Sequence, residues 1–284
     1  MATTSIASKN IAAPRKRAEG LAITMQALRS AQIPVGAGAF YAFFVALICG
    51  LVYPTLANFN LSGYLTSSVV SGLVGVKLPN ASSFSALVAL ELYSSFYGLI
   101  FGGLVAYIAG AALPTTFENG TLDLALSRPI SRSRYYLELW LSAVISGLIL
   151  SVLTVFAVWL STLFVTNANV NWQWLFTAQA IGFAFFFMAT GVGMLFGSFI
   201  NASRAAGGAA IGIIGLFYLM NTLGGLSDKL SWMQKIEPFY YAQAAEAIAL
   251  HTITWWYPWV LVIIGVVLGI IGLVVFNRRD LPTT

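Results

Sequence analysis

Charged residues are scarce in this sequence: Lys, Arg, Asp and Glu make up 8% of its 284 residues, whereas 59% are hydrophobic. Soluble domains carry about 25% charged residues, so this chain lacks the polar surface that a water-soluble fold requires. The lone cysteine, Cys49, and the lone histidine, His251, exclude a disulfide framework, a thiolate metal site and a histidine-based triad. The sequence contains no Gly-Lys pair, which excludes a phosphate-cradling P-loop.

Long apolar runs are abundant instead. A helix needs about 20 apolar residues to cross a bilayer, and these runs are continuous rather than alternating, which excludes barrel strands. We therefore expect an all-α membrane protein, a six-transmembrane-helix bundle that forms one domain over residues 37–284. The predicted spans are 37–57, 84–113, 139–165, 174–199, 206–226 and 256–276.

Two segments outside the spans also have helical patterns. Residues 1–36 are predicted to be a cytoplasmic tail followed by an amphipathic elbow helix on the inner membrane surface, which ends before Pro34. Its apolar residues recur at helical spacing: Leu21, Met25 and Leu28. Residues 233–250 are predicted to re-enter the outer leaflet before the last span, within a belt of interfacial aromatic residues.

Positive charge is distributed unevenly between the predicted loops. With the N-terminus inside, 11 of the 14 Lys and Arg residues are cytoplasmic: Lys9, Arg15, Lys16, Arg17, Arg29, Arg128, Arg132, Arg134, Arg204, Arg278 and Arg279. This bias follows the positive-inside rule and predicts a multi-pass protein of the cell membrane with both termini cytoplasmic. The net charge of +5 then reflects orientation and attraction to membrane lipid, and no nucleic-acid partner is expected.

Ionisable groups are nearly absent from the predicted spans. Glu91 is the only acid at the edge of one, and we expect it at headgroup depth. An autonomous channel or secondary transporter would need more polar groups along its spans. A membrane-embedded lipid enzyme would need clustered acids, but Glu118 and Asp123 are five residues apart, about 140° around a helix, and do not converge on one metal. Both classes remain as alternatives, and no metal or cofactor is expected in this chain.

The most informative segment is 114–138, between the second and third spans. Glu118, Leu122 and Leu126 recur at intervals of four, which predicts a short amphipathic helix. Arg128 precedes a proline, which disfavours continuing that helix. The pattern indicates a rigid helix presented to a cytoplasmic partner.

The run from Glu118 to Arg132 resembles the signature of type-2 ABC transporter permeases, whose typical form is E-x-G-T-L-E/D-x-L-L-S-x-P-x-S-R. The chain's end from Phe276 to Leu281, with the sequence FNRRDL, is also common in that family. The resemblance implies a permease subunit that pairs with a second copy or a related permease on two ABC ATPase subunits. ATP and Mg would bind in those partners, so this chain is not expected to be an enzyme by itself. The exported substrate would be hydrophobic or amphiphilic.

The resemblance also assigns roles to residues. Segment 118–126 would be the coupling helix, seated in a groove of the ATPase. The coupling residues would be Glu118, Gly120, Thr121, Leu122, Asp123, Leu126, Arg128 and Arg132. The aromatic and polar residues expected to face a substrate pathway are Tyr93, Phe96, Tyr97, Tyr218 and Asn221. Within the same family the chain is also similar to the membrane subunit of nitrous-oxide-reductase maturation, which transmits force to a periplasmic chaperone, and this stays an alternative.

Overall fold

A computed structural model describes residues 21–56, 83–120, 130–166 and 168–279, and every regular element within these ranges is helical. Six helical segments of this part are long and apolar enough to cross a membrane. They are α2 (Gln32–Leu56), η1 with α7 (Gly98–Gly102 and Gly103–Glu118), α9 (Arg132–Thr162), α10 (Trp172–Phe199), α11 (Ser203–Leu226) and α14 (Tyr257–Arg278). The prediction of an all-α protein with six spans is confirmed.

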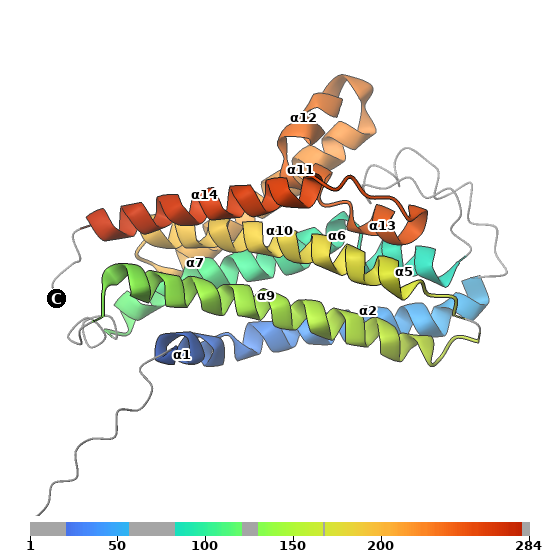
Figure 1. Cartoon of the computed structure of the whole chain (residues 1–284), viewed down its shortest axis with the longest axis horizontal. Helices are drawn as coiled ribbons and strands as arrows, with labels where there is room; N and C mark the ends of the chain where they lie inside the picture. The colour runs from blue at the N-terminus through green and yellow to red at the C-terminus, as the bar shows by residue number, and fades with distance from the viewer. Residues whose placement is uncertain (1–20, 57–82, 121–129, 167, 280–284) are drawn as a thin grey trace, which may run out of the picture.

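Helix α10 forms the centre of the bundle. It packs against α7, α9, α11 and α14 (Figure 1), and 72% of its most apolar stretch is buried, compared with 28% for α2, α11 and α14. Its buried aromatic residues Phe185 and Phe186 join the main hydrophobic core. Four of the other spans therefore surround α10, whereas α2 packs mainly against α9.

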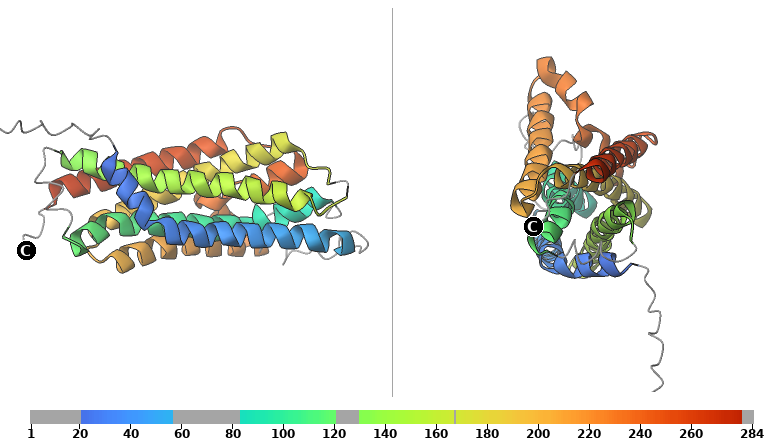
Figure 2. Two further views of the ribbon diagram at one scale, coloured as in Figure 1. Left: turned by 90° about the horizontal axis from the view of Figure 1, so that it is seen from below. Right: turned by 90° about the vertical axis from the view of Figure 1, so that its left-hand side faces the viewer.

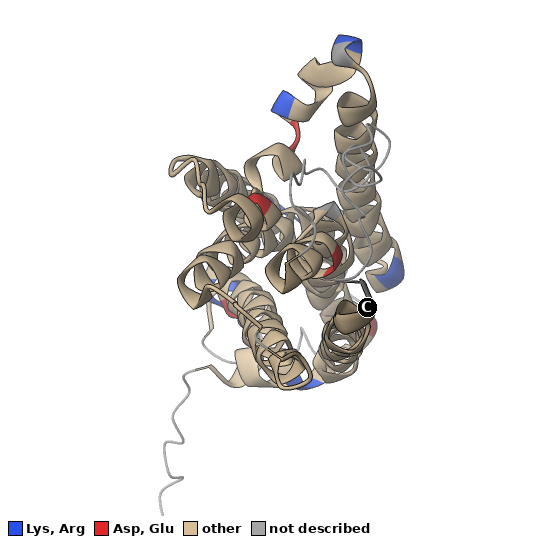
Figure 3. Cartoon of the chain, turned by 90° about the vertical axis from the view of Figure 1, so that its right-hand side faces the viewer, with Lys and Arg blue, Asp and Glu red and all other residues tan. Residues whose placement is uncertain are grey.

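The outward sides of these spans are apolar. Phe40 of α2 is 71% exposed, and Val152 of α9 and Ile263 of α14 are each 61% exposed. Seen along the bundle, most of the described ribbon carries neither Lys, Arg, Asp nor Glu (Figure 3). A surface of this kind requires lipid rather than water as its solvent, in agreement with a multi-pass membrane protein.

The second span differs from its prediction. Residues 84–113 do not form one helix: α5 (Phe84–Leu92) ends at Tyr93, and the chain restarts as a short α6 (Ser95–Tyr97) and the π-helical η1 before α7. The prediction of a continuous span was wrong because hydropathy does not register the break. Tyr93 and Tyr97 both turn inward to bond one buried side chain of α10, and the interruption gives these two residues that direction.

In the predicted elbow segment the structure has one short helix, α1 (Ala22–Ser30). One residue separates α1 from α2. Pro34 lies in the first turn of α2, where a backbone N–H would have no partner within the helix, so the proline costs no hydrogen bond there. Figure 2 shows α1 turning away from the axis of α2 at the end of the bundle. Its position on the membrane surface stays a prediction.

The outer segment before the last span contains four short helices: η2 (Asp228–Leu230), α12 (Ser231–Ile236), η3 (Pro238–Tyr241) and α13 (Ala244–Leu250). Helix α12 and the C-terminal half of α11 project from the bundle (Figure 1 and Figure 2), whereas α13 packs against α10 and α5. Helical structure in residues 233–250 is thus confirmed, and its re-entry into the bilayer stays a prediction.

Small residues bring α7 and α10 into close contact. An added Cβ at Gly193 would lie 2.7 Å from the backbone nitrogen of Gly110, and one at Gly197 would lie 2.8 Å from the carbonyl oxygen of the same residue. In lipid, helices associate through such close packing because apolar burial gives little advantage there. The Gly193-x-x-x-Gly197 pattern therefore acts within the chain, between two of its own spans.

Candidate functional site

The described arginines gather at one end of the bundle, here called the basic end. It comprises the end of α7, the starts of α9 and α11, the end of α14, and α1. The arginines found there are Arg29, Arg132, Arg134, Arg204, Arg278 and Arg279, whereas Lys229 and Lys235 lie at the opposite end. The residues of both sequence motifs that the structure describes belong to the basic end.

Glu118 is the last residue of α7 and is bonded to the first residue of α11. Its carboxylate oxygens accept hydrogen bonds from the backbone N–H of Ser203 at 2.8 Å and from the Ser203 hydroxyl at 2.6 Å. The N-cap residue of α11, Ala202, provides no capping side chain. Glu118 therefore caps α11 from another helix and satisfies a backbone donor that would otherwise depend on water.

Gly120 ends α7. Its φ of +61° is left-handed, and its N–H bonds the carbonyl of Phe117 at 3.1 Å while the N–H of Asn119 bonds that of Thr115 at 3.1 Å. Glycine is favoured in this conformation because a Cβ there is strained. The expectation that Glu118 lies early in a short helix was wrong, because α7 continues through Pro114 and stops only at this glycine.

Five of the predicted coupling residues lie outside the described residues: Thr121, Leu122, Asp123, Leu126 and Arg128. The segment that contains them is bounded by Glu118 on one side and by Arg132 on the other. Both of these bounding residues bond helices other than their own.

Arg132, the first residue of α9, joins the end of α14. Its guanidinium donates to the backbone carbonyl of Arg279 at 3.0 Å, and the Asn277 side chain donates to the Ser133 hydroxyl at 2.9 Å. Arg279 in turn donates to the Ser198 carbonyl at 3.0 Å, at the end of α10, and to the Asn201 side chain at 2.6 Å. The two sequence motifs, far apart in the chain, are in contact at the basic end.

A second carboxylate also caps a helix other than its own. Glu138 is buried in α9, where one carboxylate oxygen accepts from the Ile23 N–H at 3.2 Å and the other from the Arg134 guanidinium at 3.0 Å. The Thr24 hydroxyl donates to the Glu138 carbonyl at 3.1 Å. Like α11, α1 has no capping side chain of its own, since its N-cap is Leu21. Sequence reasoning missed Glu138, although its spacing of four from Arg134 is an ion-pair signal.

The predicted pathway residues lie in three separate places. Tyr93 and Tyr97 lie in the core and both bond the side chain of Gln179. The Tyr93 hydroxyl donates to the side-chain oxygen of Gln179 at 2.8 Å, and the side-chain NH2 of Gln179 donates to the Tyr97 hydroxyl at 2.7 Å. Phe96 and Tyr218 face each other with ring centroids 5.6 Å apart. Gln179 was not singled out from the sequence, although it is a polar residue inside an apolar span.

Asn221, the fifth of these residues, holds α12 against α11. Its carbonyl and side-chain oxygens accept from the Gln234 amide at 3.1 Å and 3.2 Å. These contacts place the five residues in three local settings, and their exposure to a substrate stays a prediction.

Glu237 organises the outer segment. It is fully buried, and its carboxylate accepts from the backbone N–H groups of Phe239 at 2.6 Å and Tyr240 at 2.8 Å, which caps η3. Burial raises the pKa of Glu237 to about 8, against the opposing effect of these two donors. The capped turn places the Phe239 ring against Gly98 of η1 and against Phe185 of α10. The outer segment therefore contacts the second span at its π-helical turn.

Comparison with known families gives one match. The sequence profile of the family described as "ABC-2 family transporter protein" matches residues 2–281. Among curated proteins no sequence matches. The family match covers nearly the whole chain, including all six spans and both motifs at the basic end.

Proposed function

The chain belongs to the ABC-2 family of transporter proteins, and from that premise we propose that it is the permease subunit of an ATP-binding cassette exporter. A separate ATPase subunit hydrolyses ATP, and the permease moves a hydrophobic or amphiphilic substrate. The apolar spans, with few charges among their described residues, support a cargo of that class.

The observation that carries this proposal is the bonding around segment 119–131. Glu118, just before the segment, bonds the start of α11, and Arg132, just after it, bonds the end of α14. Arg279 extends these contacts to the end of α10. A partner that pushes on this segment thus acts on α7 and α9 directly, and on α10, α11 and α14 through hydrogen bonds. This arrangement suits a coupling element.

Orientation follows from charge. Six of the described cations lie at the basic end and two at the other, so the positive-inside rule places the basic end in the cytoplasm. The anionic lipid of the inner leaflet also attracts the arginines of the basic end. We expect both termini and the coupling segment on the cytoplasmic side, where an ATPase reaches them.

Cysteine labelling tests this orientation. In a Cys49→Ser background, Ser231→Cys is expected to react with an impermeant thiol reagent on intact cells, because α12 lies at the outer end and Ser231 is exposed. Ala202→Cys, exposed in the turn before α11, is expected to react only after the inner side is opened. The reverse pattern would invert the orientation.

The partner is tested by purification in a mild detergent. A Walker-type ATPase of separate sequence is expected to copurify in equal stoichiometry, and native mass spectrometry is expected to show two copies of each chain. An exposed face of α11 supports the pairing of permeases, because an added Cβ at Gly208 or Gly212 would meet nothing within 4 Å. The chain purified without the partner serves as the control and is expected to hydrolyse no ATP. Robust hydrolysis by it alone would refute the assignment.

A further inference from the structure

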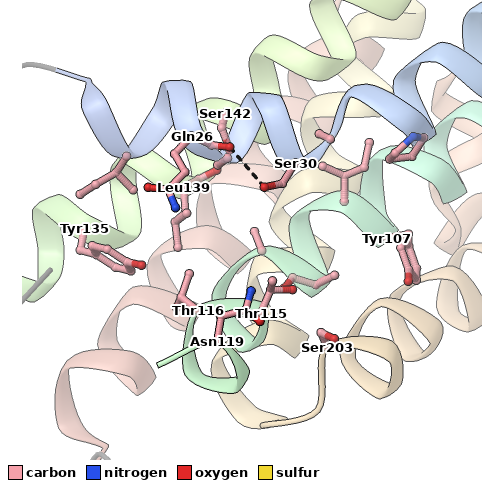
Figure 4. A pocket seen from close by; sticks show the side chains of 17 residues that line it. Gln26, Ser30, Tyr107, Thr115, Thr116, Asn119, Tyr135, Leu139, Ser142 and Ser203 are labelled. Atoms are coloured by element: carbon pink, nitrogen blue, oxygen red, sulfur yellow. Dashed lines mark hydrogen bonds between the residues drawn. The ribbon is translucent and has the colours of Figure 1, made fainter. Parts of the chain in front are cut away.

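A cavity of about 340 Å³ lies at the basic end, lined by α1, the first turn of α2, α7, α9 and the first residue of α11 (Figure 4). This volume is within the range of about 300–1,000 Å³ that is typical of small-molecule sites. None of the 17 residues that line it is acidic or basic. About half of them carry hydroxyl or carboxamide groups.

Two hydroxyls of this cavity are poised to accept hydrogen bonds. The Thr115 hydroxyl already donates to the Ala111 carbonyl at 2.7 Å, and the Ser30 hydroxyl donates to the Gln26 carbonyl at 3.3 Å, so both oxygens have lone pairs to offer. The side-chain carboxamides of Gln26 and Asn119 have no hydrogen-bond partner among the described residues. Together these groups match a ligand that carries several hydroxyls.

An anionic ligand is disfavoured for three reasons. Among the residues that the structure describes, no cation lines the cavity. The carboxyl end of α7, which reaches it at Asn119, carries the negative end of that helix's dipole. The Glu118 carboxylate lies beside it, bonded to the cavity-lining Ser203. The electrostatics therefore select an uncharged head.

Away from the basic end the lining is mostly apolar, with Tyr107 and Ser142 as its polar members, and the Ser142 hydroxyl already donates to the Leu139 carbonyl. Along α7 it runs from Asn119 and Thr115 through Ala111 and Ala112 to Ile108, a length of roughly 16 Å at 1.5 Å per residue. Leu139 of α9 and Pro34 of α2 continue this apolar part. A ligand that fits both parts is an amphiphile, with its head at the basic end and its chain toward the membrane interior.

We propose that this cavity binds an uncharged amphiphile whose head carries hydroxyls, such as a monoacylglycerol or a neutral glycolipid. Thr115, Gln26 and Asn119 hold the head, and the wall formed by Ile108, Pro34 and Leu139 holds the chain. Occupancy requires only the chain itself, so binding is measured without an ATPase, and its failure leaves the proposed transport function standing.

The test is equilibrium binding of tritiated 1-oleoylglycerol to the purified full-length chain in detergent micelles, with unlabelled competitors. The matched lysophosphatidate, which has the same chain and glycerol plus a phosphate, is expected to compete at least about tenfold more weakly because its charge has no partner here. Free glycerol is expected to compete only at far higher concentration. If lysophosphatidate competes as well as 1-oleoylglycerol, the ligand's head need not be uncharged and the proposal is wrong. If free glycerol competes as well, the ligand needs no apolar chain and the proposal is also wrong.

Variants place the ligand in this cavity. Thr115→Val keeps the side-chain shape and removes the hydroxyl, and it is expected to weaken binding about fivefold. Thr177→Val is the matched control, because its hydroxyl makes the same back-bond, to the Gln173 carbonyl at 2.9 Å, at an exposed site elsewhere. Equal effects of the two changes would refute the site.

A second pair of variants fills space rather than removing a hydroxyl. Ala111→Phe is expected to abolish binding, whereas Ala37→Phe, on the exposed side of α2, is expected to preserve it. Binding that persists in Ala111→Phe would place the ligand elsewhere. If that variant fails to fold, the Thr115→Val and Thr177→Val comparison decides the question.

Discussion

Gly193→Ala is expected to lower the stability of the bundle by about 3 kcal/mol or more, the upper range for overpacking a core. The added methyl group would lie 2.7 Å from the Gly110 nitrogen and 2.6 Å from the Ala109 Cβ of α7. The first of these is a backbone atom of a packed helix, so the contact is relieved only if α7 and α10 move apart. Because α10 is the central helix, this separation disturbs every span that packs on it.

Thermal unfolding followed by tryptophan fluorescence in detergent measures this effect. Gly103→Ala is the matched control, since an added Cβ there meets nothing within 4 Å although the residue belongs to α7 itself. The control is expected to stay within about 1 kcal/mol of the parent, because only helix propensity changes. Equal midpoints for the two variants would show that the close approach of α7 and α10 does not limit stability.

The six spans were predictable because their signal is local. Each is an apolar run of the length that a bilayer requires, and the start of α9 at Arg132 differs from the predicted 139 only because the amphipathic first turns contain charged residues such as Glu138. The prediction of one continuous helix for the second span was wrong because it too used only this local signal. Hydropathy continues across Tyr93, whereas the contact that Tyr93 makes at the break is with Gln179, which is 86 residues away in the chain.

The caps at the basic end could not be predicted from the sequence. A local capping signal requires a side chain at the N-cap itself, and the N-cap residues of α1 and α11 are Leu21 and Ala202. The carboxylates that cap these two helices belong to Glu138, 115 residues after Ile23, and to Glu118, 85 residues before Ser203. The motif at 118–132 gave Glu118 no partner within the chain, whereas the structure shows its carboxylate bonded to Ser203; the coupling role of the segment stays a prediction.

The two partners of Glu118 lead to different predictions for Glu118→Ala. If the carboxylate acts through α11, the variant is expected to fold and bind the ATPase, because the residue is exposed and a lost cap costs about 0.5–2 kcal/mol. ATP turnover would then no longer respond to the permease, with the stimulation reduced about tenfold, within the usual range of coupling free energies. If Glu118 instead contacts the ATPase, the variant is expected to lose affinity for it.

A double-mutant cycle with Ser203→Ala separates these cases. Ser203→Ala removes the hydroxyl that donates to Glu118 and leaves the backbone N–H, so alone it is expected to weaken the stimulation less than Glu118→Ala does. In the Glu118→Ala background it is expected to add nothing, because the shared interaction is already lost. Glu138→Ala, which removes the other foreign cap, controls for the loss of a carboxylate at this end. Additive effects of Glu118→Ala and Ser203→Ala would show that the link between α7 and α11 does not transmit the motion of the coupling segment.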